Sequence, residues 1–296
     1  MKTLTIFTPA YNRVHTLERT YQSLCNQTCK DFEWLIIDDG STDNTYNIVK
    51  GWIKEADFFI KYIYKENGGL YTGYNTAYAN IETELNVCID SDDYMPVNAV
   101  EIIINHWKKY GNEKYAGIIG LDFYHNKNVP IGGFFPTELN EVYFLDLYTK
   151  NIHHGDTKQV MRTDLMKEVA PMKGFPNEKN FNPVYMLMQV CDVFPLLVLN
   201  ENLCFVDYQE NDSMSKAIYW QYRNSPKSLV KQRLLELSLK RNTLKNKFRI
   251  AIHYISSCIF AKEKKWFSKS PSKTLTILAI PFGVALNLFI RYKTWK

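Results

Sequence analysis

Cysteine is scarce in this 296-residue chain, and the six cysteines are scattered along it. None of them forms a C-x-x-C pair, and Cys88 lies inside an apolar segment. We therefore expect free, buried thiols in a protein of the reducing cytoplasm. Cys25 and Cys29 are one helical turn apart, which leaves a redox or metal-binding role open, although no other feature supports it.

Other sequence features are also missing, and each absence argues against a class of protein. No G-x-G-x-x-G motif follows the first predicted strand, which argues against a dinucleotide-dependent oxidoreductase. The first residues show neither a basic region nor a long apolar stretch, so we expect no secretory signal. We find no internal repeats and no low-complexity segment. The composition, 46% hydrophobic and 15% aromatic, is typical of a packed globule, long enough for one large α/β domain and an appendage.

The net charge of +5 hides a strong asymmetry between two parts of the chain. Residues 216–296 contain 18 Lys or Arg and two acids, whereas the remainder contains 18 bases and 29 acids. A basic tail on an acidic body predicts contact with an anionic surface, either nucleic acid or a membrane leaflet. No nucleic-acid recognition fold accompanies the charge, so we expect an anionic membrane surface and no nucleic acid as the partner.

The tail also contains an apolar run over residues 275–290, interrupted by Pro281 and Gly283. As a helix this run would be about 24 Å long, short of the roughly 30 Å hydrocarbon core of a bilayer, and Pro281 would kink it. Trp266 and Trp295 bracket the run, and basic residues flank it on both sides. We interpret it as a peripheral or partly inserted anchor; the alternative is a final helix packed on the body.

Strand and helix patterns alternate over the first 110 residues. The predicted strands cover residues 3–8, 32–37, 59–64 and 85–89, and the predicted helices cover 14–29, 44–56, 71–81 and 97–110. This order implies a Rossmann-like α/β fold with a mainly parallel sheet flanked by helices. Further strands are predicted at 115–122, 196–199 and 204–206, and a helical pattern begins at Ser228. We therefore expect a ligand-binding α/β domain over 1–215 and a basic helical extension over 216–296.

The acidic cluster Asp90-Ser91-Asp92-Asp93 follows one of the apolar strands. Ligands in open α/β sheets bind at the carboxyl ends of strands, and crowded carboxylates repel one another unless a cation neutralises them. Mg²⁺ and Mn²⁺ suit such oxygen ligands, and Mg²⁺ is commonly bound by one or two carboxylates with substrate phosphates. The cluster therefore predicts a metal-diphosphate site; the alternative is an acidic turn that caps the next helix.

Three further polar segments end consecutive predicted strands. They are Thr8-Pro9-Ala10-Tyr11-Asn12-Arg13, Asp38-Asp39-Gly40-Ser41-Thr42-Asp43 and Glu66-Asn67-Gly68-Gly69. Each is compatible with an ordinary turn, but together they would line one edge of a single sheet. With Gln27-Thr28, Asn75 and the acidic cluster, this set resembles family 2 of the inverting glycosyltransferases, which have the A-type nucleotide-sugar-binding fold. The resemblance is strong over residues 3–110 and weaker to about residue 215.

The resemblance implies a role for each matching residue. It implies a nucleoside site made by Thr8, Pro9, Tyr11, Asp38, Asp39, Asn67, Gly68 and Asp90. Within that site, Asp39, with Asp38, would accept hydrogen bonds from the base. Asp90 would face ribose or metal, and Asp92 would bind Mn²⁺ or Mg²⁺. A cation there would stabilise the charge on a diphosphate leaving group.

One departure from the family pattern concerns phosphate neutralisation. Many relatives carry a basic residue after the glycine pair or before the asparagine, where this chain has Leu70, Tyr71 and Tyr74. Neutralisation would then depend on the metal or on a base from elsewhere, such as Lys65 or Arg162.

A second departure concerns the catalytic base. Val184 stands where relatives usually carry a carboxylate, and inverting transfer needs a base to accept the acceptor proton. Glu178 and Asp156 are the nearest substitutes, and we place Glu178 first. The alternative for either one is a solvated loop carboxylate. His153 or His154 could serve as base or metal ligand, and the alternative is a pair that is merely exposed or already hydrogen-bonded.

These features predict a metal-dependent glycosyltransferase that uses a nucleotide-diphosphate sugar, in particular a UDP-sugar. The acceptor would be a lipid-linked molecule or a glycan in cell-surface polysaccharide synthesis. The enzyme would be cytoplasmic and peripherally associated with the inner face of the membrane. The alternative is a catalytically silent relative that keeps nucleotide-sugar binding and serves in an assembly, which the departures at Val184 and after the glycine pair would favour.

Overall fold

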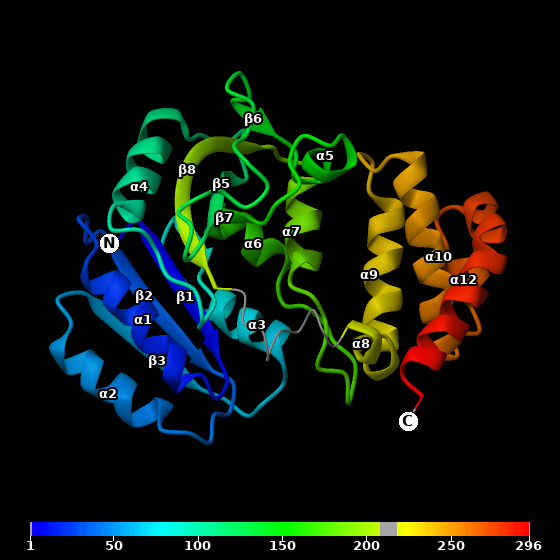
Figure 1. Cartoon of the computed structure of the whole chain (residues 1–296), viewed down its shortest axis with the longest axis horizontal. Helices are drawn as coiled ribbons and strands as arrows, with labels where there is room; N and C mark the ends of the chain where they lie inside the picture. The colour runs from blue at the N-terminus through cyan, green and yellow to red at the C-terminus, as the bar shows by residue number, and fades with distance from the viewer. Residues whose placement is uncertain (1, 208–217, 296) are drawn as a thin grey trace.

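The structure, a computed structural model, describes residues 2–207 and 218–295 (Figure 1). The expected boundary between residues 215 and 216 lies outside the described residues. The strands are β1 (Leu4–Ala10), β2 (Phe32–Asp38), β3 (Phe59–Tyr64), β4 (Leu85–Cys88), β5 (Gly117–Tyr124), β6 (Glu141–Val142), β7 (Thr157–Arg162) and β8 (Leu196–Val206). The helices before β8 are α1 (Val14–Cys25), α2 (Thr45–Glu55), α3 (Leu70–Asn80), α4 (Ala99–Tyr110), α5 (Phe144–Thr149), α6 (Thr163–Val169) and α7 (Val184–Cys191). After β8 come α8 (Ile218–Asn224), α9 (Pro226–Ser238), α10 (Leu244–Ala261), α11 (Trp266–Lys269) and α12 (Lys273–Lys293).

The described strands form a single mixed sheet in the order β3-β2-β1-β4-β7-β5-β8-β6. The first four are parallel, β7 runs antiparallel to both β4 and β5, and β8 is parallel to β5. Because β7 is inverted, its amino end lies at the same edge of the sheet as the carboxyl ends of β1, β2 and β4. The register places Val160 opposite Val87 and Thr157 opposite Leu121. Asp90 after β4 and Asp156 before β7 therefore share one edge.

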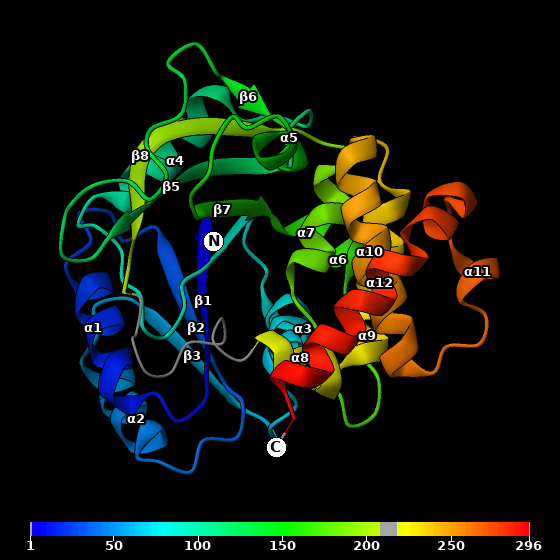
Figure 2. The same cartoon turned by 45° about the vertical axis from the view of Figure 1, so that its right-hand side comes forward.

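Apolar side chains alternate between the two faces of the sheet, as a doubly covered sheet requires. Ile6, Trp34 and Val87 belong to a core with α1, α2 and α4, whereas Phe7 and Leu35 belong to a core with α3, α6 and α7. Figure 2 shows α1 and α2 on one side of β1 to β3 and α3 on the other. The predicted mainly parallel α/β architecture is confirmed.

Two of the differences between the predicted elements and the structure are due to polar side chains. The first helix ends at Cys25 rather than at residue 29, since the Gln27 side chain turns back to donate to Ser23 O (3.0 Å) and Pro96 O (2.7 Å). The segments 196–199 and 204–206 form one strand, β8. The pairing of β8 with β5 shifts register between Ile119 and Leu121, which accommodates the polar residues that interrupt the apolar pattern.

The C-terminal helices form a unit of their own at one end of the molecule, seen at the right of Figure 1. They enclose a separate hydrophobic core that includes Tyr254, Ile255 and Ala279. Helix α12 passes through Pro281 without ending and lies against α10. A Cβ on Gly283 would come within 2.5 Å of Ile255 Cβ, so glycine there allows the close approach of the two helices.

The opposite face of α12 is exposed and apolar. Its exposed large side chains include Ile277, Leu278, Phe282, Leu288 and Phe289. Among the described helices, α12 is the one long and apolar enough to cross a membrane by length and composition. One face of α12 therefore packs on α10, within the extension itself, and the anchor stays a prediction for the other face.

Candidate active site

An acidic cluster lies at the shared edge of the sheet, and it includes a buried lysine. Asp93 and Asp122 are 5% and 3% exposed, and Lys158 on β7 lies between them. Its Nζ is 3.9 Å from Asp93 Oδ2 and 3.7 Å from Asp122 Oδ1. The antiparallel insertion of β7 between β4 and β5 brings these groups together. Lys158 thus supplies a positive charge to an otherwise negative cluster.

The pKa values in this cluster show that its negative charge is only partly compensated. Burial, opposed by Lys158 and aided by Asp156 and Asp90, raises the pKa of Asp122 to about 6. Burial and the neighbouring carboxylates likewise raise the pKa of Asp93. Burial lowers the pKa of Lys158, but Asp122 and Asp93 outweigh it and hold that pKa above its usual range. A divalent cation at this edge would relieve the remaining repulsion.

Asp90 and Asp92 offer oxygen ligands for such a cation. Burial and the charge of Asp90 raise the pKa of Asp92, so the two carboxylates lie close to each other. Within residues 2–207 and 218–295, no group of three or more His, Cys, Asp or Glu is arranged to hold a metal by itself. The donor set therefore fits an ion held by one or two carboxylates and completed by substrate phosphates.

Asp38 and Asp39, at the end of β2, hold the neighbouring turns in place through hydrogen bonds. Asp38 Oδ1 accepts from Ser41 N (2.7 Å), and Asp38 Oδ2 accepts from the Tyr62 hydroxyl. Asp39 accepts from the backbone N–H groups of Gly68 (3.0 Å) and Gly69 (2.9 Å) and forms an ion pair with Lys65.

The same contacts bring Asn67 and Gly68 to the end of β2, and their place along the nucleoside stays a prediction. Asn67 Nδ2 donates to Asp39 O (2.8 Å). Gly69 has a φ of +89°, and a Cβ there would lie 2.3 Å from Lys179 O, so the turn requires glycine. Whether Asp39 also reads a base stays a prediction, since its oxygens already have partners within the protein.

Thr8 and Pro9 are buried near the end of β1, and their place at the border of a nucleoside pocket stays a prediction. Strand β1 continues to Ala10, beyond the predicted end at residue 8, so both residues lie inside the sheet. Thr8 is fully buried and its Oγ1 accepts from Trp34 Nε1 (3.0 Å). Helix α3 covers Pro9, because Gly73 approaches its ring closely. Tyr11, which is 49% exposed, is the member of this group that reaches the surface.

The two candidate bases differ sharply in their surroundings. Glu178 is 7% exposed, and both its oxygens accept from the amino end of α9: Oε1 from Lys227 N (3.0 Å) and Oε2 from Ser228 N (2.7 Å). Asp156 is exposed at the cluster edge, close enough to raise the pKa of Asp122. This geometry reverses our order of preference and places Asp156 ahead of Glu178.

The histidine pair before Asp156 gives no better base. His153 is 1% exposed and packs on Phe135, with ring centroids 4.8 Å apart. Burial lowers the pKa of His153. His154 is exposed in the same loop. A buried, neutral imidazole packed on an aromatic ring is the position expected of a packing residue.

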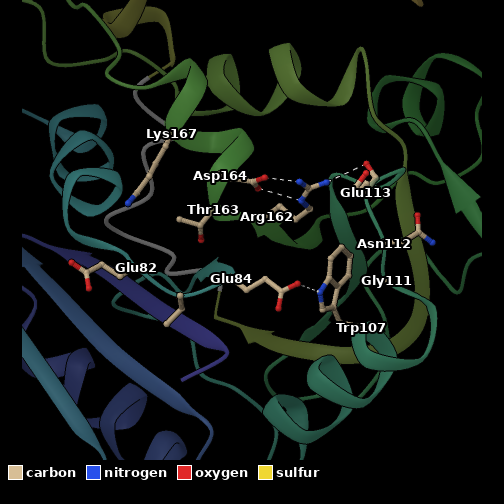
Figure 3. Close-up of a pocket in the computed structure, with 11 residues that line it drawn as sticks. Glu82, Glu84, Trp107, Gly111, Asn112, Glu113, Arg162, Thr163, Asp164 and Lys167 are labelled. Atoms are coloured by element: carbon tan, nitrogen blue, oxygen red, sulfur yellow. Dashed lines mark hydrogen bonds and ion pairs between the residues drawn. The ribbon is translucent and has the colours of Figure 1, made fainter. Parts of the chain in front are cut away.

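Arg162 lies at the opposite edge of the sheet, so its suggested role in phosphate neutralisation is wrong. It pairs with Leu85 at the amino end of β4, beside a cavity of about 510 Å³. Arg162 forms an ion pair with Asp164, and Trp107 Nε1 donates to Glu84 Oε1 (2.6 Å). Figure 3 shows both pairs beside the cavity. These groups satisfy one another.

Sequence reasoning missed the basic groups that do lie near the acidic cluster. Arg13 and Arg19 both lower the pKa of Asp92, against the larger effect of burial. Arg19 donates to Asp92 O and is 2.9 Å from Asp207 Oδ2. Lys158 was also missed, although a lysine inside the strand pattern Thr157–Arg162 is a signal that a buried acid lies nearby.

Comparison with known proteins identifies the class. The profile of glycosyl transferase family 2 matches residues 5–169, more than half of the chain, and the chain belongs to this family. It is a glycosyltransferase with the A-type fold that the sequence predicted.

Known relatives align in sequence with only part of this chain. The chain is 32% identical over 145 residues (49% of this chain, 20% of the relative) to the glycosyltransferase GlyA of Streptococcus pneumoniae serotype 4. It is 32% identical over 126 residues (41% and 38%) to the poly(ribitol-phosphate) beta-N-acetylglucosaminyltransferase TarP of Staphylococcus aureus. It is 31% identical over 125 residues (40% and 38%) to the GalNAc(5)-diNAcBac-PP-undecaprenol beta-1,3-glucosyltransferase of Campylobacter jejuni. The chain thus spans well under half the length of each relative.

Solved structures extend the likeness of the fold to nearly the whole chain. S. aureus TarS 1–349 in complex with UDP-GlcNAc superposes with a TM-score of 0.64 at 18% identity, covering 99% of this chain and 92% of TarS 1–349. The mannosyltransferase PcManGT of Pyrobaculum calidifontis, with GDP-Man and Mn²⁺, gives a TM-score of 0.56 at 14% identity, covering 99% and 82%. At these identities the likeness establishes the fold, and the substrates of this chain are a separate question.

Proposed function

We propose that this glycosyltransferase moves a sugar from a UDP-sugar, with Mn²⁺ or Mg²⁺, to a lipid-linked or glycan acceptor in cell-surface polysaccharide synthesis. The observation that carries the proposal is the acidic edge formed by Asp90, Asp92 and Asp93. Support for the donor comes from neighbours crystallised with UDP-GlcNAc or with GDP-Man and Mn²⁺. Support for the acceptor comes from relatives named for poly(ribitol-phosphate) and for a PP-undecaprenol substrate.

In this proposal the protein contributes positioning and electrostatics. Asp92 and Asp90 hold the divalent ion, which would stabilise charge on the departing diphosphate. Arg13 and Arg19 add positive charge at the same edge. We assign Tyr11 and Asn67 to the nucleoside.

Transfer with inversion, as the family resemblance implies, is a single displacement. The acceptor oxygen forms a bond to the anomeric carbon as the bond from that carbon to the diphosphate oxygen breaks. Asp156 accepts the acceptor proton, because it is the exposed carboxylate beside the cluster. Glu178 acts by holding the amino end of α9.

The proposed location is the cytoplasmic face of the membrane, with the C-terminal helices as a peripheral contact. The exposed apolar face of α12 supports it. Lys273 and Lys293 at the two ends of this helix add positive charge for anionic headgroups.

A donor screen tests the proposal. The purified protein is incubated with a panel of UDP- and GDP-sugars in Mn²⁺, Mg²⁺ or EDTA, and nucleotide binding and diphosphate release are measured. We expect metal-dependent binding of a UDP-sugar and slow release of UDP. Tight UDP binding without release under any condition or with any acceptor would favour the silent binding module, and equal UDP affinity in EDTA and Mn²⁺ would contradict the metal role.

A further inference from the structure

A second cavity, of about 660 Å³, lies between the α/β body and the C-terminal helices. Helices α5 and α7 of the body and helices α9 and α10 of the extension contribute its walls. The lining residues used below are Tyr148, Arg233, Glu236, Lys245, Arg249 and His253. No motif that predicted the donor site contributes to it.

The cavity is positively charged. Arg233 is paired with the one acid among the described lining residues, Glu236, at 2.6 Å. Lys245 and Arg249 are exposed, and neither forms an ion pair within residues 2–207 and 218–295. Burial, with Arg233 and Arg249, lowers the pKa of His253 to about 4, so its imidazole is neutral at pH 7. Two uncompensated cations therefore face a space large enough for a ligand.

The amino end of α10 adds to this charge. Thr243, Lys245 and Asn246, at the start of this 18-residue helix, line the cavity. Thr243 Oγ1 accepts from Asn246 N (3.3 Å), so the cap occupies one of the first backbone N–H groups and leaves others in the first turn directed along the helix axis. The amino end of a helix attracts anions through these groups and the helix dipole.

The cavity reaches toward the candidate active site. Tyr148 and Val184 both line it. The Tyr148 hydroxyl lies 3.4 Å from Thr157 Oγ1, and Thr157 directly follows Asp156 in the chain. Asp156 and Asp122 both raise the pKa of Tyr148, after the larger effect of burial, so these carboxylates are close to it. Tyr148 thus separates the proposed base from the basic cavity.

We propose that this cavity binds a phosphate group of the acceptor and holds it with Lys245, Arg249 and the amino end of α10. The inference rests on the proposed function, because it assigns the acceptor side of the same site. A phosphate held there would bring the acceptor to the side of the cavity formed by Tyr148, beyond which Asp156 lies. The phosphate can belong to a lipid-linked diphosphate or to a phosphodiester polymer, and the two sources require separate probes.

The test measures binding without transfer. Titration calorimetry in EDTA uses farnesyl diphosphate as the lipid probe, a glycerol phosphate oligomer as the polymer probe, and farnesol as the neutral control. The variants are Lys245→Ala/Arg249→Ala and, as a matched control, Lys247→Ala, which removes a charge from the same helix outside the cavity lining. The three substituted residues are at least partly exposed, so the variants should fold.

We expect the double variant to weaken binding of one phosphate probe at least tenfold, about 1.4 kcal/mol, with farnesol unaffected and Lys247→Ala within twofold of wild type. The probe whose binding is weakened identifies the source of the phosphate, a lipid-linked diphosphate or a phosphodiester polymer. Failure of both phosphate probes to bind at millimolar concentration, or equal affinity in all variants, would overturn the inference. UDP binding in Mn²⁺, measured on the same samples, reports on the proposed function independently.

Discussion

Single residues at the acidic edge owe their properties to neighbours that are remote in sequence. Asp93 and Asp122 are buried acids that remain in the fold because Lys158 lies between them. Asp92 has two arginines nearby and yet a raised pKa, because burial and Asp90 outweigh them. The edge is therefore suited to accept positive charge from a bound ion.

Asp92→Ala should abolish the increase in UDP affinity that Mn²⁺ produces, because it removes a carboxylate that we assign to the ion. Calorimetric titration of UDP with and without Mn²⁺ measures this effect. Asp57→Ala is the control, since Asp57 is an exposed acid before β3 at the opposite edge. Retention of the full Mn²⁺ effect in Asp92→Ala would show that the ion is held elsewhere.

The pKa of Asp122, about 6, predicts a pH dependence of stability. An unfolded Asp has a pKa near 3.9, so between about pH 4 and 6 the folded protein binds more protons than the unfolded chain. The free energy of unfolding contributed by Asp122 therefore falls as pH rises through that window. In EDTA, the drop in Tm from pH 5 to pH 7 should be smaller in Asp122→Asn than in wild type by at least about 2 °C. Equal drops in Tm for wild type and Asp122→Asn in calorimetric scans would show that Asp122 does not cause the pH dependence.

At the scale of elements, α9 is joined to the body by a side chain that sequence reasoning placed in catalysis. Glu178 accepts from two backbone N–H groups in the first turn of α9, and Asp192 accepts from the backbone N–H of Lys240 (3.2 Å) beyond its last turn. A carboxylate at the amino end of a helix stabilises it through unpaired N–H groups and the helix dipole. The two contacts position the helical extension against the body.

Glu178→Gln and Asp156→Asn should therefore have opposite consequences. Glu178→Gln should lower the free energy of unfolding by about 1–3 kcal/mol, because one buried N–H loses its carboxylate acceptor, and should leave measurable sugar transfer in the folded fraction. Asp156→Asn should fold normally, bind UDP normally and lose at least about a hundredfold in transfer rate. Denaturant unfolding and a UDP-release assay separate the two. A folded Glu178→Gln protein without transfer would restore Glu178 as the base.

At the scale of the molecule, the chain combines an acidic α/β body with a basic helical end. Because α12 packs on α10 through Ala279 and Gly283, the apolar side chains on its other face remain exposed. Truncation of α12 would uncover the core of the helical unit. Substitutions on its exposed face are therefore the sharper test of membrane contact.

Leu278→Glu/Leu288→Glu should reduce binding to vesicles containing phosphatidylglycerol at least tenfold while UDP binding is unchanged. The two leucines are 57% and 61% exposed, so the fold should tolerate the change. Phe59→Glu is the matched control, an apolar side chain that is 58% exposed on the α/β body. Co-sedimentation measures the effect; undiminished binding of the double variant would exclude α12 as the contact surface.

Local sequence determined much of this protein. Apolar periodicity predicted β1 to β4 and their helices, since buried parallel strands and amphipathic helices have distinct repeats. The motifs at consecutive strand ends predicted the family and the edge where ligands bind, because parallel strands bring their carboxyl ends together.

Only the tertiary structure decided which charged side chains are buried or hydrogen-bonded and which are exposed at the ligand-binding edge. The insertion of β7 between β4 and β5 brings Lys158 to Asp93 and Asp122, and no local pattern specifies that pairing. Both carboxylate oxygens of Glu178 accept hydrogen bonds from the amino end of α9, while Asp156 stays exposed. These differences depend on contacts between segments far apart in the chain, and burial and hydrogen bonding across such contacts decide whether a carboxylate caps a helix or stays exposed at the cluster edge.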